Sequence, residues 1–342
     1  MYRSPLFPSS NLALHVASYF LILLGLAAAA PLTAKGANFP PFPECAERLT
    51  SWLSPVTLAF LSSMPLSTQP LAPPSPDPNT PVIDFRDVYL GFPEGDVLRG
   101  ISFSAKHRET LVLLGETGTG KTLTLKLAVG LMDADSGEID VLGQRVSGTP
   151  ERDLLDFRRN LGFVFQEGAL FDSLTVGENV AYRLIEDGET QDTFQPKVEE
   201  ILRFVELEHT IDMLPSELSG GMRRRVSIAR ALINRPKIVL YDSPTAGLDP
   251  VTSQTIITLI LRLRDVFGVT ALLATHRLQD GFALANFRFD PKTKSVRRDP
   301  TSEDLNSVVT RFLVLRDGKV YFAGFPEELL ATKDPYLQRF LI

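Results

Sequence analysis

The stretch TLVLLGETGTGKT, residues 110–122, joins an apolar run to a glycine-rich loop. The apolar run, residues 110–115, predicts a short buried strand that ends in glycine. The loop fits the pattern G-x-x-x-x-G-K-[ST] and lies between that strand and a helical segment, which is the context that the pattern requires. Glycines let backbone N–H groups turn toward phosphate oxygens, and the start of the helix adds a partial positive charge. The sequence therefore predicts a nucleotide-binding loop.

The residues of this loop are the first candidate ligands of ATP. We expect the Lys121 ammonium to reach the β and γ phosphates and the Thr122 hydroxyl to bind Mg²⁺. The expected nucleotide-binding residues of the loop are Gly115, Glu116, Thr117, Gly118, Thr119, Gly120, Lys121 and Thr122.

A second stretch, KIVLYDSPTAGLDP at residues 237–250, supplies a carboxylate. Residues 238–241 are apolar and run into Asp242, which predicts a buried strand with a carboxylate at its C-terminal end. Such a carboxylate can hold the Mg²⁺ shell opposite the phosphate loop. Taken alone, Asp242 also fits an ordinary strand-end residue that caps a turn.

Strands and helices alternate along residues 82–342. Further buried strands are predicted at residues 161–166 and 269–275, and helices at residues 121–131, 196–205, 220–234 and 251–267. This alternation predicts an α/β fold with a parallel sheet and helices on both of its faces. Residues 82–103 alternate differently and predict an antiparallel, half-exposed sheet.

The composition fits a folded domain of this size. Apolar residues make up 44% of the 342-residue chain, which is enough for a sizeable core. The formal net charge of -6 disfavours a nucleic-acid-binding surface. The chain has one cysteine, Cys45, so no intrachain disulfide is possible.

Residues 1–81 differ from the rest and predict an extension ahead of the domain. Residues 12–32 are nearly all apolar and fit a signal peptide or a membrane-spanning helix. Residues 64–81 are rich in proline, which predicts an extended linker. Since an exported nucleotide-binding domain would lack ATP, two alternatives remain: a membrane anchor at residues 12–32, or a translation start at Met64. We favour the start at Met64.

A further glycine pair lies in LSGGM, residues 218–222, at the start of a predicted helix. Ser219 can cap this helix, and the free N–H groups of its first turn form a second anion site. The arginines that follow are expected to form a solvated helix face: Arg223, Arg224, Arg225 and Arg230.

The order of these motifs resembles that of the ATP-binding subunits of ABC transporters. The phosphate loop, Gln166 after a strand, LSGG, Asp242, GLDP at residues 247–250 and ATH at residues 274–276 follow one another as in that family. The resemblance covers residues 82–342. It implies a P-loop NTPase fold of the ABC type, with a RecA-like parallel-sheet core, an N-terminal antiparallel β subdomain and a helical signature subdomain.

The resemblance also implies a homodimer of two chains placed head to tail. Each ATP then lies between the phosphate loop of one copy and Ser219, Gly220 and Gly221 of the other.

The remaining site residues are carried over from the same family. Gln166 would contact Mg²⁺ and the attacking water, and would relay to the membrane partner, so that the metal ligands are Thr122, Gln166 and Asp242. His276 would contact the γ-phosphate, Asp249 would lie at the dimer contact, and Phe92 would stack on adenine. Phe92 has an alternative interpretation, as a core residue of the first sheet.

A narrower resemblance concerns the ATPases of the Mla and Mkl lipid-transport systems. It rests on FVFQEGALFDSLTVGENVAY at residues 163–182, on LSGGMRRR, and on the final residues KDPYLQRFLI. It implies a permease, a substrate-binding protein of the MCE type, and a phospholipid or another hydrophobic substrate. It also implies a peripheral position on the cytoplasmic face of the inner membrane.

The chain departs from the ABC pattern at Ser243, where the family has a glutamate that polarises the attacking water. A serine hydroxyl cannot serve as an equivalent base at neutral pH, and losing a general base costs about 10²–10⁴-fold in rate. We therefore expect ATP binding with slow turnover, unless another group substitutes. Glu167 is a candidate, with a plain surface carboxylate as the alternative.

Two functions remain open from the sequence. The first is the energy-coupling ATPase of a lipid-type transporter, and the second is an ATP-binding switch that regulates a membrane complex. A second departure, at residues 286–310, predicts an added hairpin in which Phe287 and Phe289 alternate with polar residues.

Overall fold

The structure, a computed structural model, describes residues 80–298 and 309–340, all of which belong to one unit of the chain, Pro74–Ile342. The apolar segment 12–32, the start at Met64 and nearly all of the linker 64–81 lie outside the described residues. Among the residues that are described, no helix combines the length and the hydrophobicity that a membrane crossing requires.

A six-stranded sheet forms the centre of the unit, with the strand order β12-β11-β3-β8-β7-β6. Its strands are β3 (Thr110–Leu114), β6 (Leu161–Val164), β7 (Ile238–Asp242), β8 (Thr270–Ala274), β11 (Thr310–Arg316) and β12 (Lys319–Gly324). Neighbouring strands are parallel except at the edge, where β12 pairs antiparallel with β11. Every residue of β3, β7 and β8 is buried, as the continuous apolar runs predicted.

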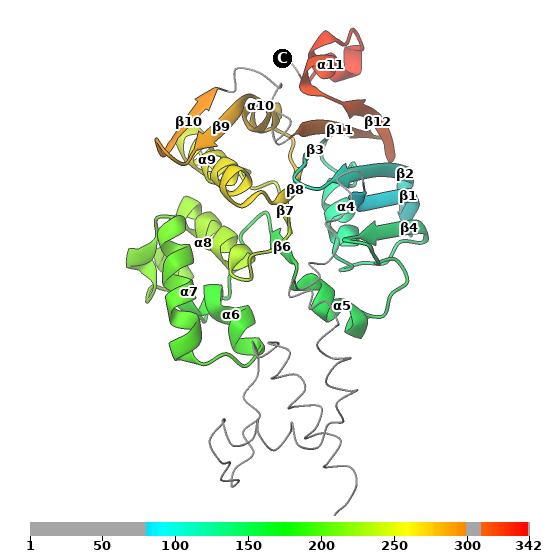
Figure 1. Cartoon of the computed structure of the whole chain (residues 1–342). Helices are drawn as coiled ribbons and strands as arrows, with labels where there is room; N and C mark the ends of the chain where they lie inside the picture. Colours follow the sequence, from blue (N-terminus) through cyan, green and yellow to red (C-terminus); the bar gives the residue numbers. More distant parts are fainter. Residues whose placement is uncertain (1–79, 299–308, 341–342) are drawn as a thin grey trace, which may run out of the picture. The chain divides into compact units, whose positions relative to one another are not determined.

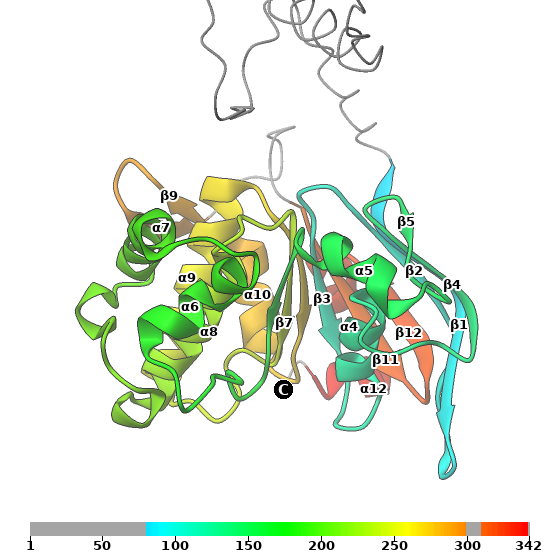
Figure 2. The same cartoon turned by 90° about the horizontal axis from the view of Figure 1, so that it is seen from below.

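Side chains alternate between two cores on opposite faces of this sheet. Leu111 and Leu113 belong to one core, and Val112 and Leu114 belong to the other. This alternation follows from the two-residue period of a strand, and it makes the sheet the middle of three layers. Figure 2 shows the sheet with helices on one side and a second sheet with α4 on the other.

The second sheet is antiparallel and has four strands in the order β2-β1-β4-β5. It includes residues 82–103, for which the sequence predicted an antiparallel sheet. Its strands are β1 (Pro81–Phe92), β2 (Gly95–Lys106), β4 (Ser136–Val141) and β5 (Gln144–Arg145). Helix α4 (Lys121–Ala128) shares a core with this sheet, and α5 (Glu151–Arg158) follows β5. Helix α4 ends three residues before the predicted end, because Gly130 adopts a left-handed φ of 66° and caps it.

The opposite face is covered by helices. They are α6 (Val176–Glu186), α7 (Gln191–Phe204), α8 (Gly220–Leu232), α9 (Pro250–Phe267) and α10 (Leu278–Asn286), with short 3₁₀ turns at η1 (Glu208–Thr210) and η2 (Pro215–Glu217). Helix α7 begins before the predicted residue 196, because Pro196 lies in its second turn and removes only one bond, to a carbonyl of the first turn. Helix α6, which was not predicted from the sequence, begins at a capping box of Thr175 and Glu178.

A hairpin of β9 (Phe287–Asp290) and β10 (Ser295–Arg298) lies against α9 (Figure 1). The N–H of Phe289 donates to Asp265 Oδ2 at 2.7 Å, and the buried guanidinium of Arg264 binds both Asp265 and the Phe287 carbonyl. These contacts fix the hairpin on α9. Two short helices, α11 (Pro326–Ala331) and α12 (Pro335–Gln338), end the described chain.

Candidate functional site

The loop from β3 to α4 has the backbone that a phosphate-binding loop needs. Gly118 and Gly120 adopt left-handed φ angles of 86° and 94°, which a residue with a Cβ adopts only with strain. A Cβ added at Gly120 would also lie 2.5 Å from Leu98 Cδ2. Both glycines are therefore required by the turn, and Gly120 is required a second time by its contact with the second sheet.

Lys121 lies inside this loop. Its Nζ donates to the carbonyls of Gly115 at 2.8 Å and Glu116 at 2.7 Å, and only 9% of the residue is exposed. Burial lowers the pKa of Lys121, and the charge of Asp242 opposes that change. Its direct hydrogen-bond partners are neutral carbonyls, so its charge remains available to an anion in the loop.

Thr122 and Asp242 are joined by a hydrogen bond between their side chains. The Thr122 hydroxyl donates to Asp242 Oδ1 at 3.0 Å, which joins the start of α4 to the end of β7. Burial raises the pKa of Asp242, and the hydrogen bond from Thr122 and the charges of Lys126 and Lys121 oppose that change. A hydroxyl and a carboxylate are hard oxygen donors of the kind that Mg²⁺ prefers, so these two residues fit the metal that the loop implies.

Ser243 follows Asp242 in a left-handed conformation with φ of 47°. Its N–H donates to the Ala274 carbonyl at 2.8 Å, and its own carbonyl accepts from the N–H of Ala246 at 3.0 Å. Its hydroxyl bonds the Asp242 carboxylate and helps to lower the pKa of that group. Ser243 thus lies next to the candidate metal ligand Asp242 and carries no carboxylate of its own.

Gln166 and His276 are exposed and lie on the turns that follow β6 and β8. The predicted strand 161–166 ends at Val164, because the chain enters a turn closed by the Gly168 N–H and the Phe165 carbonyl. Strands β3, β8, β7 and β6 are parallel neighbours, so their carboxyl ends lie at one edge of the sheet. The topology therefore gathers the phosphate loop, His276, Asp242 and Gln166 along that edge.

Ser219 and Asp249 cap helices α8 and α9, whose buried residues belong to the core opposite the one that contains α4. Ser219 Oγ accepts from the N–H of Met222 at 3.2 Å, and Asp249 Oδ1 accepts from the N–H groups of Val251 and Thr252, each at 3.0 Å. Helix α8 belongs to the core opposite the one that contains α4. A single chain therefore does not bring Ser219 together with its own phosphate loop.

Phe92 is 42% exposed at the end of β1, so the interpretation of Phe92 as a core residue is wrong.

The prediction of a solvated face at Arg223, Arg224, Arg225 and Arg230 is also wrong. All four guanidinium groups donate to backbone carbonyls, and Arg224 is 6% exposed. Arg224 contacts Phe165 and Ala246, which flank two of the turns at the site. One helical turn after Arg224, Ile228 is fully buried, and this spacing was a signal in the sequence that Arg224 faces inward.

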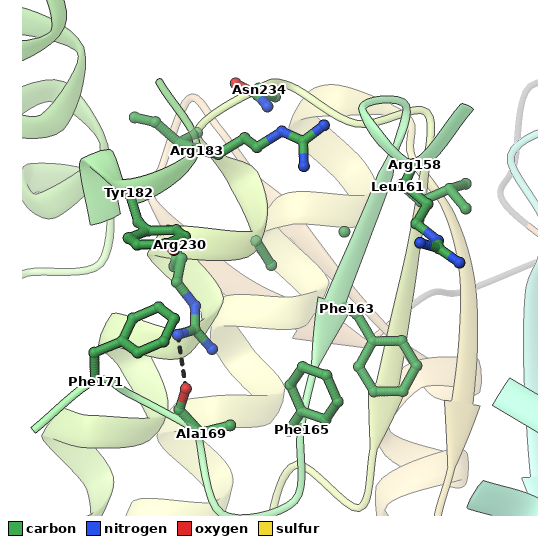
Figure 3. A pocket seen from close by; sticks show the side chains of 13 residues that line it. Arg158, Leu161, Phe163, Phe165, Ala169, Phe171, Tyr182, Arg183, Arg230 and Asn234 are labelled. Atoms are coloured by element: carbon green, nitrogen blue, oxygen red, sulfur yellow. Dashed lines mark hydrogen bonds between the residues drawn. The ribbon is translucent and has the colours of Figure 1, made fainter. Parts of the chain in front are cut away.

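A cavity of about 330 Å³ lies beside the turn that bears Gln166, and residues of β6, α6 and α8 line it (Figure 3). Two aromatic pairs line it: Phe163 with Phe165, whose ring centroids are 4.4 Å apart, and Phe171 with Tyr182, at 4.5 Å. The Arg230 guanidinium lies 5.9 Å from the Phe171 ring centroid and donates to the Ala169 carbonyl. Phe171 is 42% exposed and Tyr182 is 36% exposed, so this apolar lining faces outward.

Comparisons with known proteins decide the family. The profile of the ABC transporter family matches residues 98–246. Protein Trigalactosyldiacylglycerol 3, chloroplastic, of Arabidopsis thaliana is 34% identical over 271 residues, which cover 76% of this chain and 73% of that protein. The chain belongs to the ABC transporter family. It is the ATP-binding component, and the predicted α/β fold of the ABC type is confirmed.

Other ABC proteins match over a shorter range or at a lower identity. The methionine import ATP-binding protein MetN 1 of Staphylococcus aureus is 35% identical over 202 residues, and the match spans 58% of this chain and 59% of MetN 1. The dimeric ATP-binding cassette MJ0796, solved with ADP and Pi, has a TM-score of 0.60 at 27% identity and covers 71% of this chain and 98% of that one. The ABC protein cbiO1 of Clostridium perfringens shares the fold, with a TM-score of 0.61 at 24% identity over 76% of this chain and 95% of that one.

At the candidate metal site, the carboxylate that would bind Mg²⁺ is expected to lower the stability of the apoprotein. Because burial raises the pKa of Asp242, the folded state holds its proton more tightly than the unfolded state does. The ionised carboxylate then lowers the stability of the apoprotein as the pH rises through the folded pKa. We expect Asp242→Asn to raise the melting temperature at pH 7, flatten its dependence on pH, and remove the effect of Mg²⁺ on nucleotide binding.

Asp249→Asn is the matched control. Hydrogen bonds from Thr252 lower the pKa of Asp249, so its ionised form stabilises the fold and the substitution should not raise the melting temperature. Thermal unfolding between pH 5 and 8, with fluorescent ATP titrations with and without Mg²⁺, measures both effects. An Asp242→Asn protein that melts lower than wild type at pH 7 would contradict this account of the site.

Proposed function

We propose that this chain is the ATPase subunit of an ABC transporter for a phospholipid or another hydrophobic substrate. The observation that carries the proposal is the length of the match to the Arabidopsis protein, 271 residues against 202 for MetN 1. The longer match extends well beyond the shorter one. The Arabidopsis protein is named after a galactolipid, whereas the name of MetN 1 states methionine import. A lipid substrate is therefore favoured over a small polar one.

We propose that the working form is a head-to-tail homodimer that binds two MgATP. Helix α4, which follows the phosphate loop, and helix α8, which begins at Ser219, pack on opposite faces of the central sheet. In the proposed dimer, Ser219 therefore completes the site of a second copy. The related ATP-binding cassette MJ0796 was solved as a dimer, which supports a dimer of this chain. In the proposed dimer of this chain, Gly220 and Gly221 present N–H groups beside Ser219, and Asp249 lies at the contact between copies. Phe92 stacks on adenine, and His276 contacts the γ-phosphate.

Hydrolysis is proposed to run without the usual glutamate. Lys121 and the N–H groups of the loop stabilise charge on the phosphates, and the bound Mg²⁺ would be held by Thr122, Asp242 and Gln166. Gln166 and His276, both exposed at the same edge, can orient a water molecule. Glu167, next to Gln166 in the chain, is a candidate for a base. The alternative function, an ATP-binding switch, follows if none of these groups compensates for Ser243.

The cavity beside the turn that bears Gln166 is the proposed docking site of the permease. Its exposed aromatic side chains, Phe171 and Tyr182, suit an apolar anchor on the partner, and Arg230 is held by the Gly168 and Ala169 carbonyls. The turn that bears Gln166 joins this cavity to the candidate metal site. A movement of the partner in the cavity would therefore displace Gln166 at the nucleotide. The occupant proposed here is a segment of the membrane permease.

An MCE-type protein is proposed as an indirect partner, through the permease. The cytoplasmic face of the inner membrane is one proposed location. The chloroplastic name of the Arabidopsis relative adds a chloroplast membrane as a second.

The substrate class is tested on the complex purified with its permease in detergent. We expect added phospholipid to raise its steady-state ATPase activity severalfold and added methionine to leave it unchanged, because transport substrates lower the barrier to the coupled step. Stimulation by methionine alone would overturn the lipid assignment.

The docking site is tested in the same assay. Phe171→Ala should reduce both co-purification of the permease and the stimulation by phospholipid, because the ring is the exposed part of the cavity wall. Leu330→Ala, which removes another exposed apolar side chain far along the sequence, is the control and should keep both. A Phe171→Ala complex that assembles and responds like wild type would place the permease elsewhere.

The missing base is tested by Ser243→Glu. If the site lacks a base, the variant should hydrolyse ATP faster than wild type by about 10²-fold or more, since a general base contributes that much. If Glu167 substitutes, wild type should already turn over well, and Glu167→Gln should lower kcat by a similar factor with little change in KM. A wild type that binds MgATP but does not hydrolyse it, with the permease present, supports the switch.

A further inference from the structure

Arg224 occupies a junction between three segments of the site. It lies in the second turn of α8, and its Nη1 donates to the Phe165 carbonyl at 2.8 Å while its Nη2 donates to the Ala246 carbonyl at 3.3 Å. Phe165 and Ala246 are 59 and 22 residues away along the chain. A single buried side chain therefore joins α8 to two turns that come from different strands.

Each of these segments carries a residue of the nucleotide site. Phe165 directly precedes Gln166 and Glu167, and its carbonyl also closes their turn by accepting from the Gly168 N–H at 3.0 Å. Ala246 closes the turn that begins at Ser243. Helix α8 begins at the cap Ser219. Arg224 thus connects the residues that orient water, the residue that follows the metal carboxylate, and the helix that faces a second copy.

Arg224 keeps its positive charge although its side chain is buried. Burial lowers the pKa of Arg224, and the charges of Glu167 and Asp242 oppose that change. An arginine stays protonated throughout the physiological range, so Arg224 places a fixed positive charge near both carboxylates. Its planar fork can hold two carbonyls at once, which the compact ammonium of lysine does not reproduce.

We propose that Arg224 is a positioning residue for ATP hydrolysis, which sets the Gln166–Glu167 turn against the Ser243–Ala246 turn and ties both to the start of α8. The inference rests on the proposed ATPase function. Because Ser243 contributes no base, the reaction depends on how accurately the other groups hold the attacking water. Arg224 acts on that geometry through the two carbonyls and does not itself touch the nucleotide.

The neighbouring arginines provide matched controls on the same helix. Arg223 donates to the Leu218 carbonyl, just ahead of α8 itself, at 2.6 Å. Arg225 donates to the Val205 carbonyl after α7 at 2.9 Å. Only Arg224, of these three consecutive residues, bonds to the turns at the metal site.

The first arm of the test is steady-state ATPase activity of Arg224→Lys, Arg224→Gln and the control Arg223→Lys. We expect the two Arg224 variants to lose about tenfold to a hundredfold in kcat, with KM for ATP within about twofold, because bonds from a charged donor are lost while ground-state binding remains. Arg223→Lys should stay within about twofold of wild type. Wild-type kcat in Arg224→Lys, or a change confined to KM, would overturn the proposal.

The second arm does not depend on hydrolysis. Hydrogen exchange is measured at the Gly168 and Ala246 amides, which close the two turns, in proteins whose thermal unfolding and MgATP binding show that they are folded. Arg224→Lys should speed exchange at both amides together, and Arg223→Lys at neither. Exchange that changes at one amide only, or at neither, refutes the coupling. An inactive wild type would refute the ATPase proposal, and this arm would still decide the role of Arg224.

Discussion

The hydrogen bond between Thr122 and Asp242 is the constraint on which the site depends. It joins the first turn of α4 to the end of β7, two segments 120 residues apart, at 3.0 Å. The bond requires β3, β8 and β7 to lie side by side with their carboxyl ends aligned, and the fully buried apolar strands supply that alignment. Burial of the carboxylate opposes its ionisation. The packing that positions Asp242 for a metal therefore also lowers the stability of the fold while no metal is bound.

The central sheet divides the functional residues into two groups. The phosphate loop, Asp242, Ser243, Gln166 and His276 follow its carboxyl edge, whereas Ser219 and Asp249 cap helices of the layer on one face. Under the proposed function, this separation leaves the site of one chain incomplete, and a second copy would complete it. Two arginines of α8, Arg224 and Arg230, fix the helical layer to turns that follow strands of the sheet, through backbone carbonyls.

The sequence predicted what local chemistry decides. Three predicted features carry their signal within a short stretch of the chain: the loop at residues 115–122, the strand Ile238–Asp242 and the antiparallel sheet at residues 82–103. Contacts from distant segments were not predictable in the same way. The carbonyls that bind Arg224 belong to Phe165 and Ala246, which are distant in the sequence, and the exposure of Phe92 depends on how β1 ends. The end of α4 and the start of α7 were misplaced because Gly130 and Pro196 act through their exact position in the helix.

The most direct measurement is a cross-link between the two halves of the proposed composite site. Chains carrying Thr117→Cys or Ser219→Cys, each with Cys45→Ser to remove the natural thiol, are mixed, oxidised and separated on a non-reducing gel. We expect a cross-linked dimer that contains one chain of each kind and forms strongly only with MgATP. Absence of that mixed dimer, in proteins shown to bind MgATP, would contradict the claim that a second copy completes the site.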